Sequence, residues 1–329
     1  MQGKRAVFAI LAAAVLVVTG CSSSGGKQQE QAAGNAAAGV ADTPRMKVAM
    51  ITHATPGDTF WDIVQKGAQS AAAKDNVEFV YSSDPDGPKQ ATLMQNAIDQ
   101  KVDGIAVDLA HPDAMAGVVA KAKAAGIPVV AFNSGLDNWQ KLGAMSFFGQ
   151  DESLAGQAFG NRLNEVGAKH ALCVIQEQGQ VALEARCAGL KQAYKGQSEL
   201  LYVNQADPSA VQSTIQAKLQ QDKSIDFVAT LGAPIAQLAV QSVSGAGSSA
   251  KVATFDTNKA LVDLIKNGSV QWSVDQQPYL EGYLSVDALW LYKTNGNVSG
   301  GGKPVLTGPS FITKDNIDTV AEFAKQGTR

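Results

Sequence analysis

The chain has 329 residues, of which 45% are hydrophobic and 17% charged, with a formal net charge of −3 at pH 7. This length exceeds that of a usual single domain, so two domains are expected. A mildly acidic chain without basic clusters disfavours nucleic acid as a partner. The three cysteines and three histidines show no metal-ligand spacing, so neither a metal nor another cofactor is expected.

The first twenty residues have the organisation of an export signal. Two basic residues, Lys4 and Arg5, precede an apolar run over 6–18, which is shorter than the roughly 20 residues of a membrane-spanning helix. The run ends in Val18-Thr19-Gly20-Cys21, which resembles a bacterial lipobox. We therefore expect a lipoprotein signal peptide over 1–20 and a lipid on Cys21, which would anchor the protein to the outer face of the bacterial cell membrane, or on the periplasmic side. An ordinary signal with an incidental cysteine is the alternative.

Residues 21–45 are rich in Ser, Gly, Gln and Ala and contain no aromatic residue. A segment of this composition buries too little apolar area to offset its own ordering entropy. We therefore expect a flexible tether that lets the folded body reach partners near the membrane.

From Met46 onward, short apolar runs alternate with helical patterns. A first series of strands is predicted over 47–52, 77–81, 103–108, 127–132 and 145–149. A second series is predicted over 170–176, 199–203, 225–230, 251–255 and 270–274. Helices between strands are typical of parallel α/β sheets with right-handed crossovers, so the sequence predicts an α/β fold with two doubly wound lobes. Residues 278–294 form another helical pattern, and 303–312 are expected to be extended.

The first strand–loop–helix unit indicates a ligand site. In open parallel sheets, ligands bind beyond the carboxyl ends of the strands, which is where residues 53–59 fall. Phe60 and Trp61 stand beside Asp58 at this point. Apolar ring faces next to a hydrogen-bonding carboxylate suit a sugar or polyol. The alternative is that both aromatics are core residues of an amphipathic helix.

No catalytic motif accompanies this site. The sequence has no Gly-x-Ser-x-Gly elbow, no Walker A loop and no Gly-x-Gly-x-x-Gly fingerprint. His53 and His111 lie at predicted strand ends, where either could touch a ligand, whereas His170 leads into a strand and is expected to be structural. The pattern favours a binding protein over an enzyme.

Cys173 and Cys187 fall within one strand–loop–helix unit. An exported chain meets oxidising conditions, so a disulfide is favoured, and two buried free thiols are the alternative.

Several short motifs follow one another in order along the chain. They are Asp58-Thr59-Phe60-Trp61, Val102-Asp103-Gly104-Ile105, His111-Pro112-Asp113-Ala114, Gly126-Ile127-Pro128-Val129, Gly149-Gln150-Asp151, Arg186-Cys187-Ala188-Gly189-Leu190, Thr254-Phe255-Asp256 and Asp275-Gln276-Gln277-Pro278. Over residues 46–320 the series resembles the sugar-binding lipoproteins of ABC transporters, of the ribose/galactose-binding type. These are type I periplasmic binding proteins, related to the effector domains of LacI-family repressors. The resemblance implies two lobes joined by a three-crossover hinge near residues 150, 276 and 307.

The resemblance also implies roles for particular residues. Phe60 and Trp61 match the two aromatics that sandwich a sugar ring, and Asp58 matches a polar ligand residue that is usually Asn. Arg186 matches an arginine that donates to two sugar oxygens, as its fixed fork of donors allows. Asp256 and Gln276 match the acceptor and the hinge amide that complete the hydroxyl network. A salt bridge is the alternative role for Arg186, and a helix N-cap is the alternative for Asp256.

The sequence departs from the family at two places. Asn133-Ser134 stands where an Asp-Arg pair is common, and Leu231-Gly232-Ala233 stands where Asn-Asp is common. With fewer polar side chains at these places, the hydrogen-bonding network around the ligand would be smaller than in the family. This disfavours simple ribose or glucose and leaves pentoses, other small monosaccharides or polyols as the expected ligands. Trp139 and Trp272 are possible walls of the ligand site, for which core packing is the alternative. Four polar residues are further candidates for ligand contacts: Asn133, Gln150, Glu177 and Gln178.

We therefore expect a monomeric solute-binding lipoprotein that closes its hinge on a small sugar or polyol and delivers it to ABC permease subunits. The expected N-terminal lobe comprises 46–149 and 277–307, and the C-terminal lobe comprises 150–276 and 308–325. A sensor that signals to a membrane receptor through the same pocket is the alternative. A cytoplasmic repressor is disfavoured because an export signal occupies the place of its DNA-binding segment, and a secreted enzyme because no nucleophile–base pair was found.

Overall fold

The computed structural model describes residues 40–329. The predicted signal peptide, the predicted lipidation site Cys21 and most of the predicted tether lie outside the described residues. Within 40–329, no helix is both long and apolar enough to cross a membrane.

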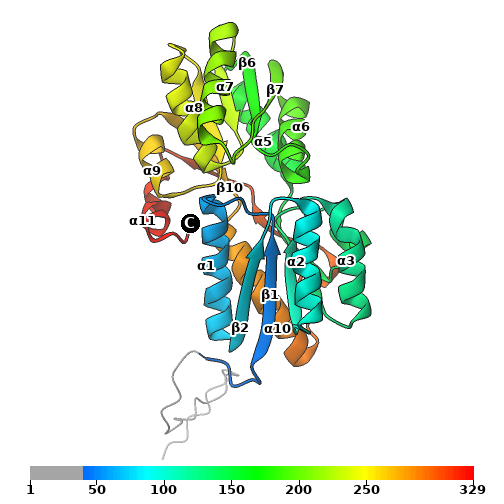
Figure 1. Ribbon diagram of the computed structural model, residues 1–329. Helices are drawn as coiled ribbons and strands as arrows, with labels where there is room; N and C mark the ends of the chain where they lie inside the picture. The colour runs from blue at the N-terminus through cyan, green and yellow to red at the C-terminus, as the bar shows by residue number, and fades with distance from the viewer. Residues whose placement is uncertain (1–39) are drawn as a thin grey trace, which may run out of the picture. The chain divides into compact units, whose positions relative to one another are not determined.

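The first lobe is built on a parallel six-stranded sheet with the order β11-β5-β4-β3-β1-β2 (Figure 1). Its strands are β1 (Met46–Thr52), β2 (Val77–Ser83), β3 (Gly104–Asp108), β4 (Val129–Phe132), β5 (Ser146–Gln150) and β11 (Val305–Gly308). One face is covered by α1 (Thr59–Lys74) and α10 (Pro278–Asn295). The other is covered by α2 (Gly87–Asp99), α3 (Pro112–Ala124) and α4 (Trp139–Leu142). Both faces of the sheet are therefore buried, as its uninterrupted apolar strands require.

The second lobe repeats this plan with the strand order β12-β10-β9-β8-β6-β7. Its strands are β6 (His170–Ile175), β7 (Gln197–Tyr202), β8 (Phe227–Thr230), β9 (Lys251–Phe255), β10 (Val270–Asp275) and β12 (Ser310–Thr313). One face carries α5 (Glu152–Glu165) and α6 (Val181–Ala193). The other carries α7 (Pro208–Gln221), α8 (Ala233–Gly245), α9 (Lys259–Lys266) and α11 (Asp318–Gln326). The predicted α/β fold of two doubly wound lobes is confirmed.

The predicted extended segment over 303–312 is in fact two strands in different sheets. It follows a short 3-10 helix, η1 (Ser299–Gly302). β11 pairs with β5 in the first lobe, and β12 pairs antiparallel with β10 in the second. The chain thus crosses between the sheets after β5, after β10 and after β11, and these three crossovers form the hinge.

The carboxyl ends of the central strands of both sheets point toward one region between the lobes. Four of the loops there follow β1, β4, β6 and β9, and they carry His53, Asn133, Glu177 and Asp256. Because strands of a parallel sheet end at a common edge, residues far apart in sequence meet there. The fold therefore places the predicted ligand residues of both lobes around a single space.

Candidate functional site

A small cavity of about 50 Å³ lies between the two lobes. Eight of the nine predicted ligand residues line it: Asp58, Phe60, Trp61, Asn133, Glu177, Arg186, Asp256 and Gln276. Gln150 does not line it, because its buried amide donates to the Glu152 carboxylate at 2.8 Å. Gln178 is exposed and also lies outside the cavity, and Trp139 and Trp272 are packed in the cores of their lobes.

Phe60 and Trp61 form an apolar corner of the cavity. Both lie in the first turn of α1 and are 9% and 4% exposed, respectively, so they also belong to the core of the first lobe. Phe60 and Trp61 therefore have both roles considered from the sequence, since they line the ligand cavity and also pack in the core. Their rings meet edge to face at 85°, with centroids 5.1 Å apart. One ligand ring cannot stack on two perpendicular ring faces at once, so the implied sandwich of a sugar ring between Phe60 and Trp61 is wrong. The two aromatic rings instead form two adjacent, perpendicular apolar surfaces of the cavity.

Asp58 both caps α1 and faces the cavity. Its carboxylate accepts a hydrogen bond from the backbone N–H of Phe60 at 3.1 Å, as expected of a helix N-cap. Burial nevertheless raises the pKa of Asp58, with the Phe60 bond acting against this shift. The helix start thus presents a carboxylate beside the two aromatic rings.

Arg186 is buried and forms a two-pronged ion pair with Glu152. Its Nε and Nη2 donate to the two carboxylate oxygens of Glu152 at 2.6 and 3.0 Å, and Nη1 donates to the carbonyl of Leu231 at 2.9 Å. Burial alone would lower the pKa of Arg186, but the attraction of Glu152, the hydrogen bonds to it and the attraction of Asp256 and Glu281 together outweigh burial and raise the pKa. Arg186 therefore has the salt bridge that was its alternative role while it also lines the cavity.

Asp256 lies at one end of a buried chain of polar side chains. Gln276 Nε2 donates to Asp256 Oδ1 at 2.7 Å, and Asn133 Nδ2 donates to Gln276 Oε1 at 3.2 Å and to Glu281 Oε2 at 3.3 Å. Burial raises the pKa of Asp256 to about 7, although Arg186 and the Gln276 bond act to lower it. The alternative role of Asp256 as a helix N-cap is wrong, because Asn258 caps α9.

Two histidines of the first lobe face Glu177 of the second. His111 Nε2 lies 3.1 Å from Glu177 Oε1, and His53 Nε2 lies 3.8 Å from Oε2. His53 is held from behind by Asp108, with Nδ1 and Oδ1 2.6 Å apart. Burial alone would lower the pKa of His53, but Asp108 and Glu177 raise it to about 9. His53 lines the cavity, whereas His111 reaches it only through Glu177.

Other hydrogen bonds also cross between the lobes. Gln180 Nε2 donates to Ser134 Oγ at 3.1 Å, and Gln205 Nε2 donates to Thr55 Oγ1 at 3.2 Å. The Val181 N–H donates to the Ala110 carbonyl at 3.2 Å. These bonds show that the structure has the closed arrangement of the lobes.

Sequence reasoning missed Glu152, Asp108, Gln180 and Gln205. Asp108 ends a predicted strand, and Gln205 and Gln180 follow strand ends by a few residues, so strand-end position was an available signal. Glu152 lies in the first turn of α5, where an acid is common, and nothing in the sequence links it with Arg186.

His170 lies at the amino end of β6, whereas the cavity lies beyond the carboxyl end of that strand. It belongs to a cluster with Glu199 and Asp222, which is the one group within 40–329 with the composition of a metal site. Glu199 is already paired with Lys218 at 2.5 Å, and Ser224 Oγ lies 2.7 Å from His170 Nδ1. The cluster is thus an ion-pair network of the kind expected of a structural histidine.

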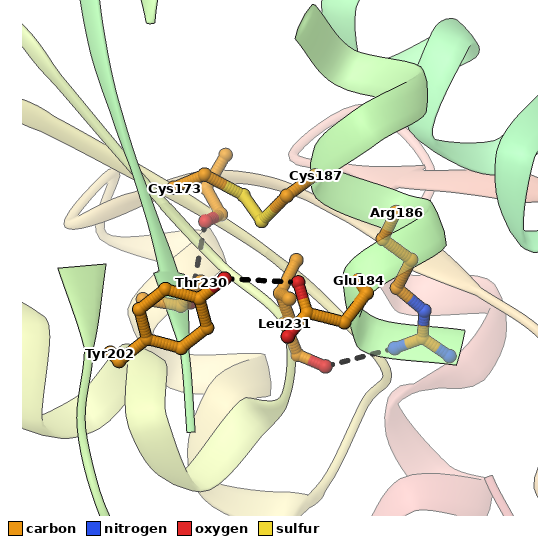
Figure 2. The surroundings of a disulfide bond; sticks show 8 residues. Cys173, Glu184, Arg186, Cys187, Tyr202, Thr230 and Leu231 are labelled. Carbon is orange, nitrogen blue, oxygen red and sulfur yellow. Dashed lines mark hydrogen bonds between the residues drawn. A yellow bond between two sulfur atoms is a disulfide. The ribbon is translucent and has the colours of Figure 1, made fainter. Parts of the chain in front are cut away.

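A disulfide joins Cys173 of β6 to Cys187 of α6, with the Cα atoms 6.0 Å apart (Figure 2). Arg186 is the neighbour of Cys187, and Figure 2 shows its guanidinium directed toward Leu231. Tyr202 and Glu184, hydrogen-bonded at 3.1 Å, are drawn in the same figure below the bridge. The bond therefore fixes the helix that carries Arg186 to β6, the strand next to the edge strand β7.

Two lobes with a hinge, a cavity between them and polar groups contributed from both sides define a protein that encloses a small polar molecule. Residues 48–297 match the periplasmic binding protein domain, so the chain belongs to the periplasmic binding protein family.

Solved and curated relatives agree with this family. A carbohydrate transporter of Acidothermus cellulolyticus 11B, in complex with myo-inositol, is 59% identical, with a TM-score of 0.86, and the match covers 87% of this chain and 100% of that one. The periplasmic sugar-binding protein of a Legionella pneumophila ABC transporter is 27% identical, with a TM-score of 0.74, covering 80% and 100%. The xylose/arabinose-binding protein XylF of Sulfolobus acidocaldarius is 28% identical over 84% of this chain and 73% of its own.

Proposed function

We propose that this protein captures a neutral cyclic polyol, with myo-inositol as the first candidate, by hinge closure and delivers it to an ABC permease. The observation that carries the proposal is the cavity between the lobes, in which an apolar corner faces carboxylate, amide and guanidinium groups from both lobes. The 59% identity with a myo-inositol complex supports the choice of a cyclitol among sugars and polyols.

The charge of the cavity favours an uncharged ligand. Three carboxylates line it, Asp58, Glu177 and Asp256, against two cationic groups, Arg186 and His53, which are already paired with Glu152 and Asp108, respectively. A sugar phosphate or uronic acid would bring a further buried negative charge without a free cation to meet it. Hydroxyl groups donate to carboxylates and accept from N–H groups, so a polyol satisfies both kinds of partner.

The proposed binding steps follow from the hydrogen bonds. Arg186 has five N–H donors, and its bonds to Glu152 and Leu231 use three, which leaves two for vicinal oxygens. Asp256 Oδ2 lies 3.8 Å from Arg186 and is positioned to accept from a hydroxyl. The CH face of the ring would rest on Phe60 or Trp61. Each hydroxyl left without a partner costs free energy on burial, so the network selects among epimers.

We extend the proposal to the cellular setting. The sequence of residues 1–45 supports export and lipid anchoring at Cys21, which would keep the closed protein near its permease. The ligand contacts assigned above and the lobe boundaries near residues 150, 276 and 307 belong to the same proposal.

The experiment is a thermal-shift and calorimetric titration with myo-inositol, D-xylose, L-arabinose and D-ribose. Ligand at 100 times Kd adds about 2.7 kcal/mol to the free energy of unfolding, which is a readily measured shift. The shift is expected with myo-inositol. For Arg186→Lys, which keeps a charge beside Glu152 but lacks the planar guanidinium, Kd should increase at least about tenfold.

Arg45→Ala is the matched control, because Arg45 is exposed and lies outside the cavity. A protein that binds a pentose but not myo-inositol would keep the sugar-binding role and exclude the cyclitol. No binding of any of the four would exclude the proposed ligand class.

A further inference from the structure

The segment after α11 returns to the hinge, where Arg329 meets a buried carboxylate. Arg329 Nη2 lies 2.5 Å from Asp275 Oδ2, and Nη1 donates to Gln277 Oε1 at 3.1 Å. The Asp275 side chain has no exposed surface, whereas that of Arg329 is 24% exposed. Lys66 of α1 also donates to the carbonyl of Gln326, so this segment contacts the first lobe as well. In Figure 1 the chain end lies beside α11 and α1.

Gln277 is the residue at which the second crossover turns. Its backbone has φ 61° and ψ 62°, a left-handed conformation that is costly for a residue with a Cβ. Its side chain does not cap α10 but donates from Nε2 to the carbonyl of Thr307 at 2.6 Å. Arg329, Gln277 and Thr307 thus form a chain of side-chain hydrogen bonds that joins the second crossover to the third.

The first crossover packs against the same point. A Cβ on Gly308 would lie 2.8 Å from the Asp275 carbonyl oxygen and 3.1 Å from Gln150 Oε1. The three crossovers are therefore in contact, with no room between them for an added methyl group. A hinge rotates through backbone angle changes at a few such residues, so groups that hold those angles bias the rotation.

Arg329 is the cation that the Asp275 carboxylate faces in this arrangement. A fully buried carboxylate without a partner is strongly unfavourable, so the pair has a reason to persist. Burial raises the pKa of Asp275, and Arg329 acts to lower it.

We propose that Arg329 is a positioning residue of the hinge, which holds Gln277 in its left-handed conformation and favours the closed arrangement of the lobes. This inference rests on the hinge closure of the proposed function, but it concerns residues outside the cavity. Without Arg329, Gln277 loses one of its two side-chain bonds and the lobes should open more readily.

The test compares Arg329→Ala, Arg329→Lys and the control Lys325→Ala. Lys325 is an exposed residue of α11 whose ammonium pairs with no carboxylate among residues 40–329. Small-angle scattering without ligand measures the opening, and calorimetry with myo-inositol measures Kd. We expect Arg329→Ala to increase the ligand-free radius of gyration and to raise Kd about five- to tenfold. Arg329→Lys, which keeps the charge but not the fork, should fall between it and the wild type.

A purely structural role predicts a different outcome. If Arg329→Ala lowers the melting temperature but matches Lys325→Ala in radius of gyration and Kd, the proposal is wrong. It is equally wrong if Arg329→Lys matches Lys325→Ala in both, since the fork would then be irrelevant. If the wild type does not bind myo-inositol, the proposed cyclitol ligand is excluded, while the ligand-free scattering still decides the role of Arg329.

Discussion

Buried carboxylates outnumber buried cations around the cavity. Glu152 is paired with Arg186, but Asp256 and Glu281 are held mainly by neutral amides and hydroxyls. Burial raises the pKa of all three groups. The site is thus rich in acceptors whose charge depends on pH, which suits recognition of hydroxyl donors.

Asp256 allows a prediction for stability against pH. Its pKa rises from 3.8 to about 7 on folding, so the folded protein holds this proton more tightly than the unfolded chain. The resulting stabilisation is complete below about pH 4 and is lost as the pH rises through about 7. Asp256→Asn removes it. The free energy of unfolding of the wild type, from urea titrations, should therefore fall relative to that of Asp256→Asn between pH 4.5 and 7.5. A constant difference over this range would contradict the assignment.

At the scale of elements, the close packing of α5 on α6 positions two charged residues of the site. α5, which bears Glu152, packs on α6, which bears Arg186, and Gly156 lies at their closest approach. A Cβ at Gly156 would lie 2.1 Å from the carbonyl oxygen of Arg186. The pairing of Glu152 with Arg186 therefore depends on a residue that contributes no side chain.

We expect Gly156→Ala to destabilise the protein, because α5 must move away from α6. Overpacking of this kind costs about 1–3 kcal/mol, and the displaced pair should also weaken ligand binding. Urea unfolding and calorimetry measure the two effects. Gly117→Ala is the matched control, since Gly117 is exposed in α3 and has open space around it. The control should gain up to about 1 kcal/mol from helix propensity. Equal behaviour of the two variants would show that the helix contact is looser than described.

The disulfide gives a second prediction at this scale. Cys173 and Cys187 are 14 residues apart, and closing a loop of this length stabilises a fold by about 3 kcal/mol in the chain-entropy treatment. Cys187→Ser should lose this amount in urea unfolding, and reduced wild type should behave the same. Because Arg186 adjoins the bridge, the variant should also bind ligand more weakly. If the reductant lowers the free energy of unfolding of Cys187→Ser as much as that of the wild type, loss of the disulfide does not explain the destabilisation.

For the whole molecule, closure depends on polar contacts between the lobes. Glu177 meets His111 across the cleft, and Gln205 Nε2 of the second lobe donates to Thr55 Oγ1 of the first at 3.2 Å. These contacts form only after the lobes have come together. They should therefore control the release of ligand more than its capture.

Glu177→Gln should accelerate ligand dissociation about fivefold, the equivalent of about 1 kcal/mol for a partly exposed ion pair, with little change in association. Stopped-flow measurements with myo-inositol separate the two rates. Glu184→Gln is the control, because Glu184 contacts Tyr202 and Gly179 within the second lobe. A slower association with unchanged dissociation would assign Glu177 to capture instead.

Much of the fold followed from local patterns. Apolar runs bounded by turns marked the strands, since a strand buried on both faces must be apolar throughout. Periodicity predicts a single extended piece over 303–312, because it does not show which sheet a strand joins. Only pairing with β5 and β10 divides it.

The sequence by itself determined the two α/β lobes, the aromatic pair beside Asp58 and most of the polar residues around the cavity, because the carboxyl ends of parallel strands lie at a common edge of the sheet. Only the tertiary structure decided that Phe60 and Trp61 are perpendicular, that Glu152 partners Arg186, and that Arg329 reaches Asp275. Those contacts join residues that are remote along the chain. Their geometry is set by the packing of helices and crossovers, which leaves no periodic pattern in the sequence.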